Sequence, residues 1–251
     1  INNYPLLNTH THLDLSDARV ISLDLNDVAK GGDAAARKKS SIMFMLARFV
    51  VTRNFFLEDN TYKFAPSLYK DYLIGKTKES RATQTRLCID EFHRTRGIEI
   101  FREQIKQDMR EGRKWGLSIC LISQLLNDFD NEMIDLCNSK FIFSGGDNYQ
   151  DIVDKFDLNG EVGSIVRTEL NGPTHLGVPF VVKFTTKSGE YTQFLYNALS
   201  PIEMWAFSST LADVKMRELA EISFGIKEGI KILADSFPNG SISGTIEKMQ
   251  R

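Results

Sequence analysis

Two adjacent carboxylates, Asp90 and Glu91, are the residues of this chain best suited to do chemistry. They follow a short apolar run at residues 87–89, and a long helical pattern comes after them. A buried parallel strand delivers acids in this way to the carboxyl edge of a sheet, where open α/β folds bind their ligands. At that edge one carboxylate can hold Mg²⁺ and the other can activate water. The alternative is a surface-exposed acid pair with no catalytic role.

The segments after the acid pair predict strands that end at the same edge. A helix is predicted over residues 98–115, a strand over 117–123, a helix over 130–138 and a strand over 140–144. This alternation, with these lengths, is typical of a parallel sheet with right-handed crossovers. Gln124, which follows the second of these strands, is therefore expected beside the two acids.

Cationic side chains mark the end of the helix predicted at residues 98–115. Arg110 belongs to a basic row along this helix, and Arg113 and Lys114 fall in its last turn. Cations at this position compensate the helix dipole, so a purely structural role is one interpretation of Arg113 and Lys114.

The residues before the acid pair predict a strand at 19–25 and an amphipathic helix at 34–54. Gly75-Lys76-Thr77 looks like the end of a phosphate-binding loop, but the full motif requires glycine where this chain has Lys70. No buried strand precedes it either. We therefore reject it and expect the phosphate cradle to lie upstream of this sequence, or to be absent.

A second sequence pattern suggests a metal site that we also reject. His10, His12 and Asp14 match the H-x-H-x-D start of metal-dependent hydrolases. Those enzymes need further histidine ligands, and only His93 and His175 remain. We interpret residues 1–19 as a solvated loop.

Composition describes an ordinary globular chain. The 251 residues carry a net charge of −2, and 25% of them are charged. Nothing in these values indicates a polyanion partner, and no apolar run is long enough to span a bilayer. The three cysteines are predicted to be reduced packing residues, and their spacing fits no zinc site: Cys88, Cys120 and Cys137.

The second half of the chain predicts a hairpin and a helical end. Strands at 180–186 and 190–195 flank a tight turn, and two short helices precede them within residues 148–170. A winged DNA-binding unit is an alternative, although the charges suit it poorly. Ser200 opens a capping box that starts the C-terminal helices. We expect two parts, a core at residues 1–199 and a helical extension at 200–251 packed on that core.

Several segments, in order, resemble the C-terminal motor domain of type IV secretion ATPases. The nearest likeness is to the DotO/IcmB group of Dot/Icm systems and the TraU-like group of conjugation systems, which are VirB-class members of the HerA/FtsK branch. The resemblance covers nearly the whole chain after residue 18. The segments that carry it are Arg-Val-Ile-Ser-Leu-Asp-Leu, Met-Phe-Met-Leu-Ala-Arg, Ile-Asp-Glu-Phe-His-Arg, Gly-Arg-Lys-Trp-Gly, Ser-Gln and Met-Trp-Ala-Phe-Ser.

The resemblance implies an α/β fold, a RecA-like P-loop NTPase core with a mainly parallel sheet, a C-terminal antiparallel hairpin and C-terminal helices. It implies ATP and Mg²⁺ as cofactors, with Asp90 in the Mg²⁺ shell and Glu91 on the attacking water. Gln124 becomes the sensor of the γ-phosphate or of that water. Arg113, or failing it Arg110, becomes an arginine finger that reaches a neighbouring subunit's nucleotide.

The function implied is ATP hydrolysis that drives effector protein export or assembly of the secretion machine. Partners would be further copies in a homo-hexamer, a second secretion ATPase such as DotB, and other secretion-system components. The protein would lie on the cytoplasmic face of the bacterial inner membrane. Because no phosphate loop is visible, hydrolysis is expected of the full-length protein. Two alternatives remain: a non-hydrolysing assembly scaffold, and a conjugative translocase that binds DNA.

Overall fold

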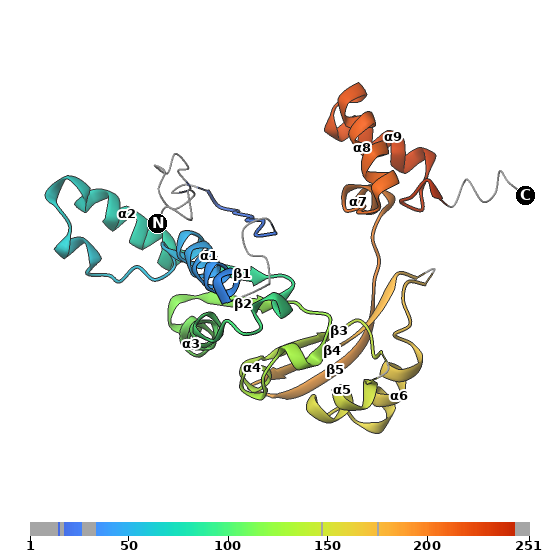
Figure 1. Cartoon of the computed structure of the whole chain (residues 1–251), viewed down its shortest axis with the longest axis horizontal. Coiled ribbons are helices and arrows are strands. Elements are labelled where there is room, and N and C mark those ends of the chain that lie inside the picture. The colour runs from blue at the N-terminus through green and yellow to red at the C-terminus, as the bar shows by residue number, and fades with distance from the viewer. Residues whose placement is uncertain (1–14, 16–17, 27–33, 147, 175, 244–251) are drawn as a thin grey trace, which may run out of the picture. The chain divides into compact units, whose positions relative to one another are not determined.

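The chain divides into two compact units, Ile1–Cys137 and Asn138–Arg251. The structure, a computed structural model, describes residue 15 and residues 18–26, 34–146, 148–174 and 176–243. It is a mixed α/β chain with one parallel and one antiparallel sheet (Figure 1). The expected boundary between residues 199 and 200 falls within the second unit.

The described residues of the first unit form four α-helices and a two-stranded parallel sheet (Figure 1). In chain order its main elements are α1 (Ala34–Thr52), α2 (Lys70–Ala82), β1 (Thr85–Ile89), α3 (Glu99–Trp115), β2 (Leu117–Leu121) and α4 (Asn131–Leu136). Short 3₁₀ helices lie between them at Thr61–Phe64, Ser67–Tyr69, Phe92–Thr95 and Leu126–Asp128. The helix and strand predicted directly after the acid pair are confirmed.

Helix α3 lies against β1 and β2 because one of its faces is apolar. Phe101 and Ile105, one turn apart, are buried in the core together with Leu87 of β1. The helix ends at Gly116, whose φ of 64° lies in the left-handed region that favours glycine. Strand β2 begins at the next residue, Leu117, so α3 forms the crossover between the two parallel strands.

A buried ion pair joins α1 to α3. The Arg48 Nε atom donates to Asp108 Oδ2 at 2.7 Å, and the side chain of Asp108 is almost fully buried. Gln104 donates a further hydrogen bond to the same carboxylate. Burial of a charge is costly unless it is paired and hydrogen-bonded, so this contact fixes how the two helices meet.

The strand predicted at residues 19–25 is not formed. Residues 18–26 are assigned to no helix or strand, although Leu25 packs against the core of the first unit. Arg94 donates a hydrogen bond to the Asn26 side chain. The pattern predicted a strand from its β-branched and alternating residues, but propensity supplies no pairing partner for the backbone.

The second unit contains a three-stranded antiparallel sheet in the order β3-β4-β5. Its strands and the two helices that precede the hairpin are β3 (Ser139–Ile142), α5 (Tyr149–Lys155), α6 (Gly160–Thr168), β4 (Val178–Thr186) and β5 (Gly189–Asn197). The predicted hairpin is confirmed. Helices α5 and α6 pack on the sheet around Val166 and Val181, both fully buried.

The strand predicted at residues 140–144 was wrongly assigned to a parallel sheet. It forms β3, which pairs antiparallel with β4, with Ile142 opposite Val181 and Ser139 opposite Phe184. A short apolar run does not reveal the direction of its partner. The long hairpin strand offers β3 an antiparallel neighbour, and the mainly parallel sheet expected from the sequence is therefore not observed.

Three helices end the described chain: α7 (Pro201–Ala206), α8 (Leu211–Phe224) and α9 (Ile226–Ser236). The predicted capping box is present, with the Ser200 and Glu203 side chains each accepting the other's backbone N–H. Trp205 is fully buried among these helices, and its Nε1 donates to the Phe237 carbonyl at 2.9 Å. No helix in the described residues is long and apolar enough to cross a membrane.

Candidate functional site

The acid pair and Gln124 lie together at the carboxyl edge of the parallel sheet. The last residues of the two strands, Ile89 and Leu121, are opposite one another, so both chains leave the sheet at the same end. The backbone remains joined beyond the strands, because the Phe92 N–H donates to the Ile122 carbonyl at 2.8 Å. The strand order predicted this meeting of residues 33 positions apart in sequence.

Glu91 occupies a conformation that is unfavourable for a residue with a side chain. Its φ of 52° and ψ of 46° lie in the left-handed region, at a cost of about 1–2 kcal/mol. The Oδ1 atom of Asp90 accepts the Glu91 N–H at 2.8 Å and stabilises the turn. Strain of this kind persists only where the surroundings enforce it, and it is concentrated at functional sites.

The Glu91 carboxylate has two side-chain partners. The Gln124 amide nitrogen lies 3.3 Å from Oε1 and 3.4 Å from Oε2. The Nδ1 atom of His93 lies 2.9 Å from Oε2. A carboxylate held between an amide and an imidazole at a partly open edge is positioned to accept a proton or to orient water. His93 was not predicted as a site residue, although its position two residues after Glu91 was the available signal.

A buried aromatic anchor fixes the turn that follows Glu91. Phe92 is fully buried and stacks on Phe129, with ring centroids 5.7 Å apart. The Arg102 guanidinium lies 4.8 Å from the Phe92 ring centroid and donates to Thr95 Oγ1. Thr95 Oγ1 in turn donates to the Phe92 carbonyl at 2.7 Å. Helix α3 thus supports the acid pair through Arg102.

A buried carboxylate, Asp128, holds the loop that carries Gln124. Ser123 Oγ donates to Asp128 Oδ2 at 2.5 Å. Arg96 approaches Oδ1 at 2.5 Å as an ion pair, without the alignment of a hydrogen bond. No local sequence pattern indicates this network, because Asp128 lies in a 3₁₀ turn and its cation, Arg96, comes from another segment.

Asp90 fits the role of a Mg²⁺ ligand in a nucleotide site. Its side chain is exposed at the sheet edge, and Oδ2 has no hydrogen bond or ion pair with a described residue. Mg²⁺ in such sites keeps several waters and needs few carboxylates, the remaining oxygens coming from phosphate groups. One free carboxylate oxygen is therefore sufficient for a contact made directly or through water.

The two arginine candidates differ in their surroundings. Arg110 pairs with Glu132 of α4, within the same unit. Arg113 is exposed in the last turn of α3, and its guanidinium has no hydrogen bond or ion pair with a described residue. The end of α3 precedes Leu117, which lies opposite Thr85 at the amino end of the sheet. Arg113 is therefore remote from the Glu91 carboxylate of its own chain.

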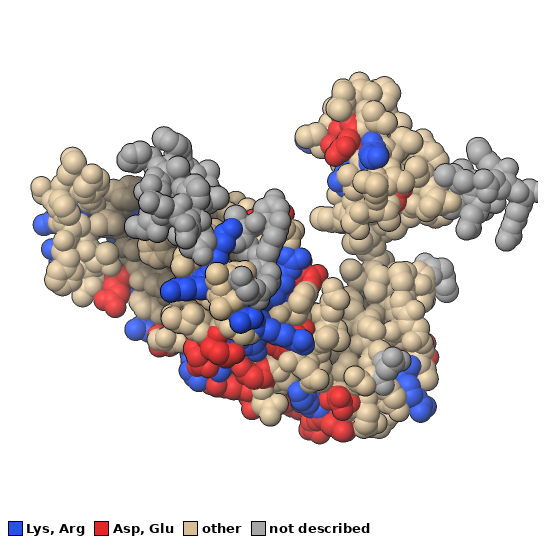
Figure 2. Space-filling model, viewed as in Figure 1, with Lys and Arg blue, Asp and Glu red and all other residues tan. Residues whose placement is uncertain are grey.

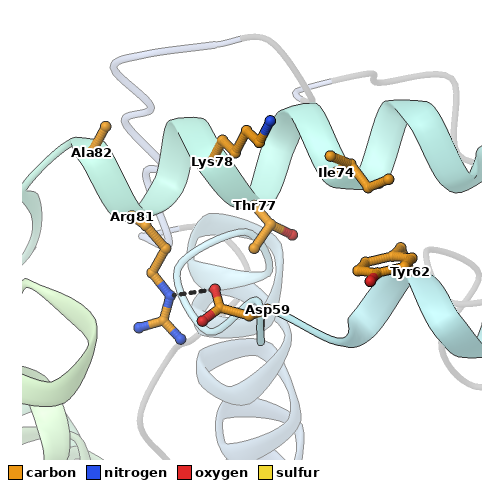
Figure 3. A pocket seen from close by; sticks show the side chains of 7 residues that line it. All are labelled: Asp59, Tyr62, Ile74, Thr77, Lys78, Arg81 and Ala82. Atoms are coloured by element: carbon orange, nitrogen blue, oxygen red, sulfur yellow. Dashed lines mark ion pairs between the residues drawn. The ribbon is translucent and has the colours of Figure 1, made fainter.

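Gly75, Lys76 and Thr77 lie inside α2, so they form no phosphate loop. Lys76 pairs with Glu79 at 3.5 Å, and the Thr77 hydroxyl is buried without a partner in the described residues. The hollow beside this helix has a volume of about 570 Å³ (Figure 3). Its lining residues are Asp59, Tyr62, Ile74, Thr77, Lys78, Arg81 and Ala82.

The described residues contain no group of three or more His, Cys, Asp or Glu side chains placed to hold a metal ion. The H-x-H-x-D pattern at His10, His12 and Asp14 lies outside them. The three cysteines are free thiols, and Cys88 and Cys120 are opposite each other in β1 and β2. Burial and the neighbouring Cys88 raise the pKa of the Cys120 thiol.

Two comparisons with known proteins find no match for this chain. No protein-family model matches it. No curated protein matches it at a significant level either. The function must be argued from the geometry of the site.

Proposed function

We propose that this chain carries the water-activating half of an ATPase centre, in a RecA-like motor domain of the type IV secretion class. The observation that carries the proposal is the contact between Glu91 and Gln124, made at the shared edge of two parallel strands. In this assignment Asp90 holds Mg²⁺, Glu91 accepts the proton of the attacking water, and Gln124 reports the presence of the γ-phosphate.

Bound ATP would supply an electrophilic phosphorus, and Mg²⁺ held by Asp90 would neutralise the phosphate oxygens. The residues of this chain would then have to orient water and move one proton. In the observed state the Gln124 amide occupies both carboxylate oxygens of Glu91. An amide can exchange this contact for a phosphate oxygen or a water, which frees Glu91 to act as the base. His93 then keeps the carboxylate oriented from the other side.

The other half of the proposed ATPase centre is the loop that holds the phosphates. Within the described residues no strand leads into a glycine-rich loop and a helix, and Gly75 to Thr77 are helical. We propose that a segment outside these 251 residues supplies the cradle. Arg113 is assigned as the finger that acts on a neighbouring subunit in a homo-hexamer, because it has no ion pair with a described residue and is remote from its own Glu91.

The proposal is tested by two measurements made side by side. The full-length protein should hydrolyse ATP only when Mg²⁺ is present. Asp90→Asn should lose most of this turnover, and the activity that remains should no longer depend on Mg²⁺. The 251-residue chain alone should bind ATP weakly. Tight ATP binding by the chain alone would contradict the assignment of the cradle to another segment.

A scaffold without hydrolysis is the second candidate, because the described residues contain no complete nucleotide site. Protein export that continues in cells carrying Glu91→Gln would favour it. A conjugative translocase is distinguished by salt-sensitive DNA binding of the assembled protein. As part of the secretion function, we also propose that the protein binds a second ATPase such as DotB and lies at the inner membrane.

A further inference from the structure

The 3₁₀ turns before α2 and the first turn of α2 expose apolar side chains that are clustered in sequence, at one end of the first unit. This segment forms the far-left end of that unit in Figure 1 and is mainly uncharged in Figure 2, with Lys or Arg side chains at its margin. The side chains, with their exposed fractions, are Phe64 (87%), Leu68 (82%), Tyr69 (55%) and Tyr72 (50%).

Lysines accompany this cluster. Lys63 lies beside Phe64 and Lys70 beside Tyr69, and both are exposed with no ion pair to a described residue. Lys76, which pairs with Glu79, lies 5.9 Å from the ring centroid of Tyr72. Residues 61–78 contain four lysines and a single carboxylate, Asp71. We call Lys63, Phe64, Leu68, Tyr69, Lys70 and Tyr72 the α2 tip.

The composition of the α2 tip distinguishes between kinds of partner. Aromatic rings among lysines also suit nucleic acid, but Leu68 has no ring on which a base can stack. A leucine and a phenylalanine that are both almost fully exposed gain most from an apolar phase. Tyrosines prefer the boundary between that phase and water, and lysines are attracted by negative headgroups. All four features are satisfied together at the surface of an anionic bilayer.

We propose that the α2 tip docks the protein onto a membrane surface rich in anionic lipid. Phe64 and Leu68 enter the acyl boundary, Tyr69 and Tyr72 lie at the headgroup level, and Lys63 and Lys70 contact the lipid phosphates. The inference names a lipid contact for the inner-membrane location in the proposed function. It does not depend on ATP hydrolysis, because none of its residues lies at the Glu91 edge.

Co-sedimentation of the 251-residue chain with vesicles tests the proposal. One set of vesicles is phosphatidylcholine, and the other contains about one third phosphatidylglycerol. We expect binding to the anionic set that weakens with salt. The double variant Phe64→Ser with Leu68→Ser should lower partitioning at least about tenfold. Lys63→Gln and Lys70→Gln should each lower it about fivefold on anionic vesicles alone.

Ile222→Ser is the matched control, because Ile222 of α8 is 83% exposed but has no place in the α2 tip. It should leave partitioning unchanged, and circular dichroism should show that every variant keeps its fold. The proposal is overturned if the Phe64 and Leu68 double variant binds as well as the parent chain. Binding to duplex DNA that outcompetes the anionic vesicles and requires the same residues would also overturn it.

Discussion

The side-chain amide of Gln124 lies 3.3 Å from the Glu91 carboxylate, although the two residues are 33 positions apart in sequence. Each is at the end of a strand, and the two strands are parallel neighbours. The contact joins the turn held by Phe92 to the loop held by Asp128. It couples the base proposed for catalysis to the residue proposed to sense the nucleotide.

Removal of the Gln124 amide should slow hydrolysis without preventing nucleotide binding. Gln124→Ala is expected to lower ATP turnover about 10²-fold, the scale of losing one aligned donor. Gln107→Ala is a matched control, because Gln107 donates to Glu111 on the exposed side of α3 and lies outside the site. Equal turnover of the two variants would remove Gln124 from the mechanism.

A mixing experiment should show which of the two arginine candidates acts as the finger. Arg113→Ala is expected to lower turnover about 10³-fold, whereas Arg110→Ala removes only an exposed ion pair with Glu132 and should have little effect. Subunits with Arg113→Ala mixed with subunits with Glu91→Gln should regain activity, because a mixed interface restores one intact site. Either of two results would rule out the finger: Arg113→Ala with the turnover of the parent protein, or an inactive Arg113→Ala that regains no activity on mixing.

The left-handed conformation of Glu91 should be measurable as strain. Because glycine adopts this conformation without the clash of a Cβ atom, Glu91→Gly should be more stable than Glu91→Ala by about 1 kcal/mol. Both variants lack the carboxylate, so both should be inactive. Urea unfolding of the two proteins measures the difference, and an alanine variant as stable as the glycine variant would show that position 91 relaxes.

Asp213 should make the C-terminal helices sensitive to acid. Burial raises the pKa of this carboxyl, but hydrogen bonds from Thr210, the Ile242 N–H and Ser241 outweigh it and hold the pKa below its usual value. A lowered folded-state pKa adds stability that is present above the unfolded pKa of about 3.9 and is lost as the pH falls through the folded value.

Asp213→Asn should therefore destabilise these helices by about 1–3 kcal/mol at neutral pH. The difference between the variant and the parent should shrink as the pH falls below about 4, where the parent carboxyl also takes up its proton. Urea unfolding at a series of pH values measures this. A difference that stays constant with pH would show that the hydrogen bonds do not depend on the charge of Asp213.

The edge that carries the candidate site could be predicted because strand order brings distant residues to one place. Asp90, Glu91 and Gln124 follow two buried strands joined by a helix, and parallel pairing puts both strand ends together. The contact of His93 and the support from Asp128 could not be predicted. They depend on the conformation of the turn at Glu91 and on a 3₁₀ segment without a sequence periodicity.

The direction in which a strand pairs is the second feature that could not be predicted from the sequence. Residues 140–144 have the composition of a buried parallel strand, yet β3 pairs antiparallel with β4. Residues 19–25 have the pattern of a strand but pair with no neighbour. Apolar periodicity reports which side of a segment is buried, while pairing depends on which free edge lies within reach.

ATP turnover by the full-length protein carrying Glu91→Gln is the most direct test of the central claim. The amide keeps the shape of Glu91 but cannot accept the proton of the attacking water. We predict that Mg²⁺ and ATP still bind, that ATP stays trapped unhydrolysed, and that turnover falls at least about 10²-fold. Turnover equal to that of the parent protein would contradict the assignment of Glu91 as the catalytic base.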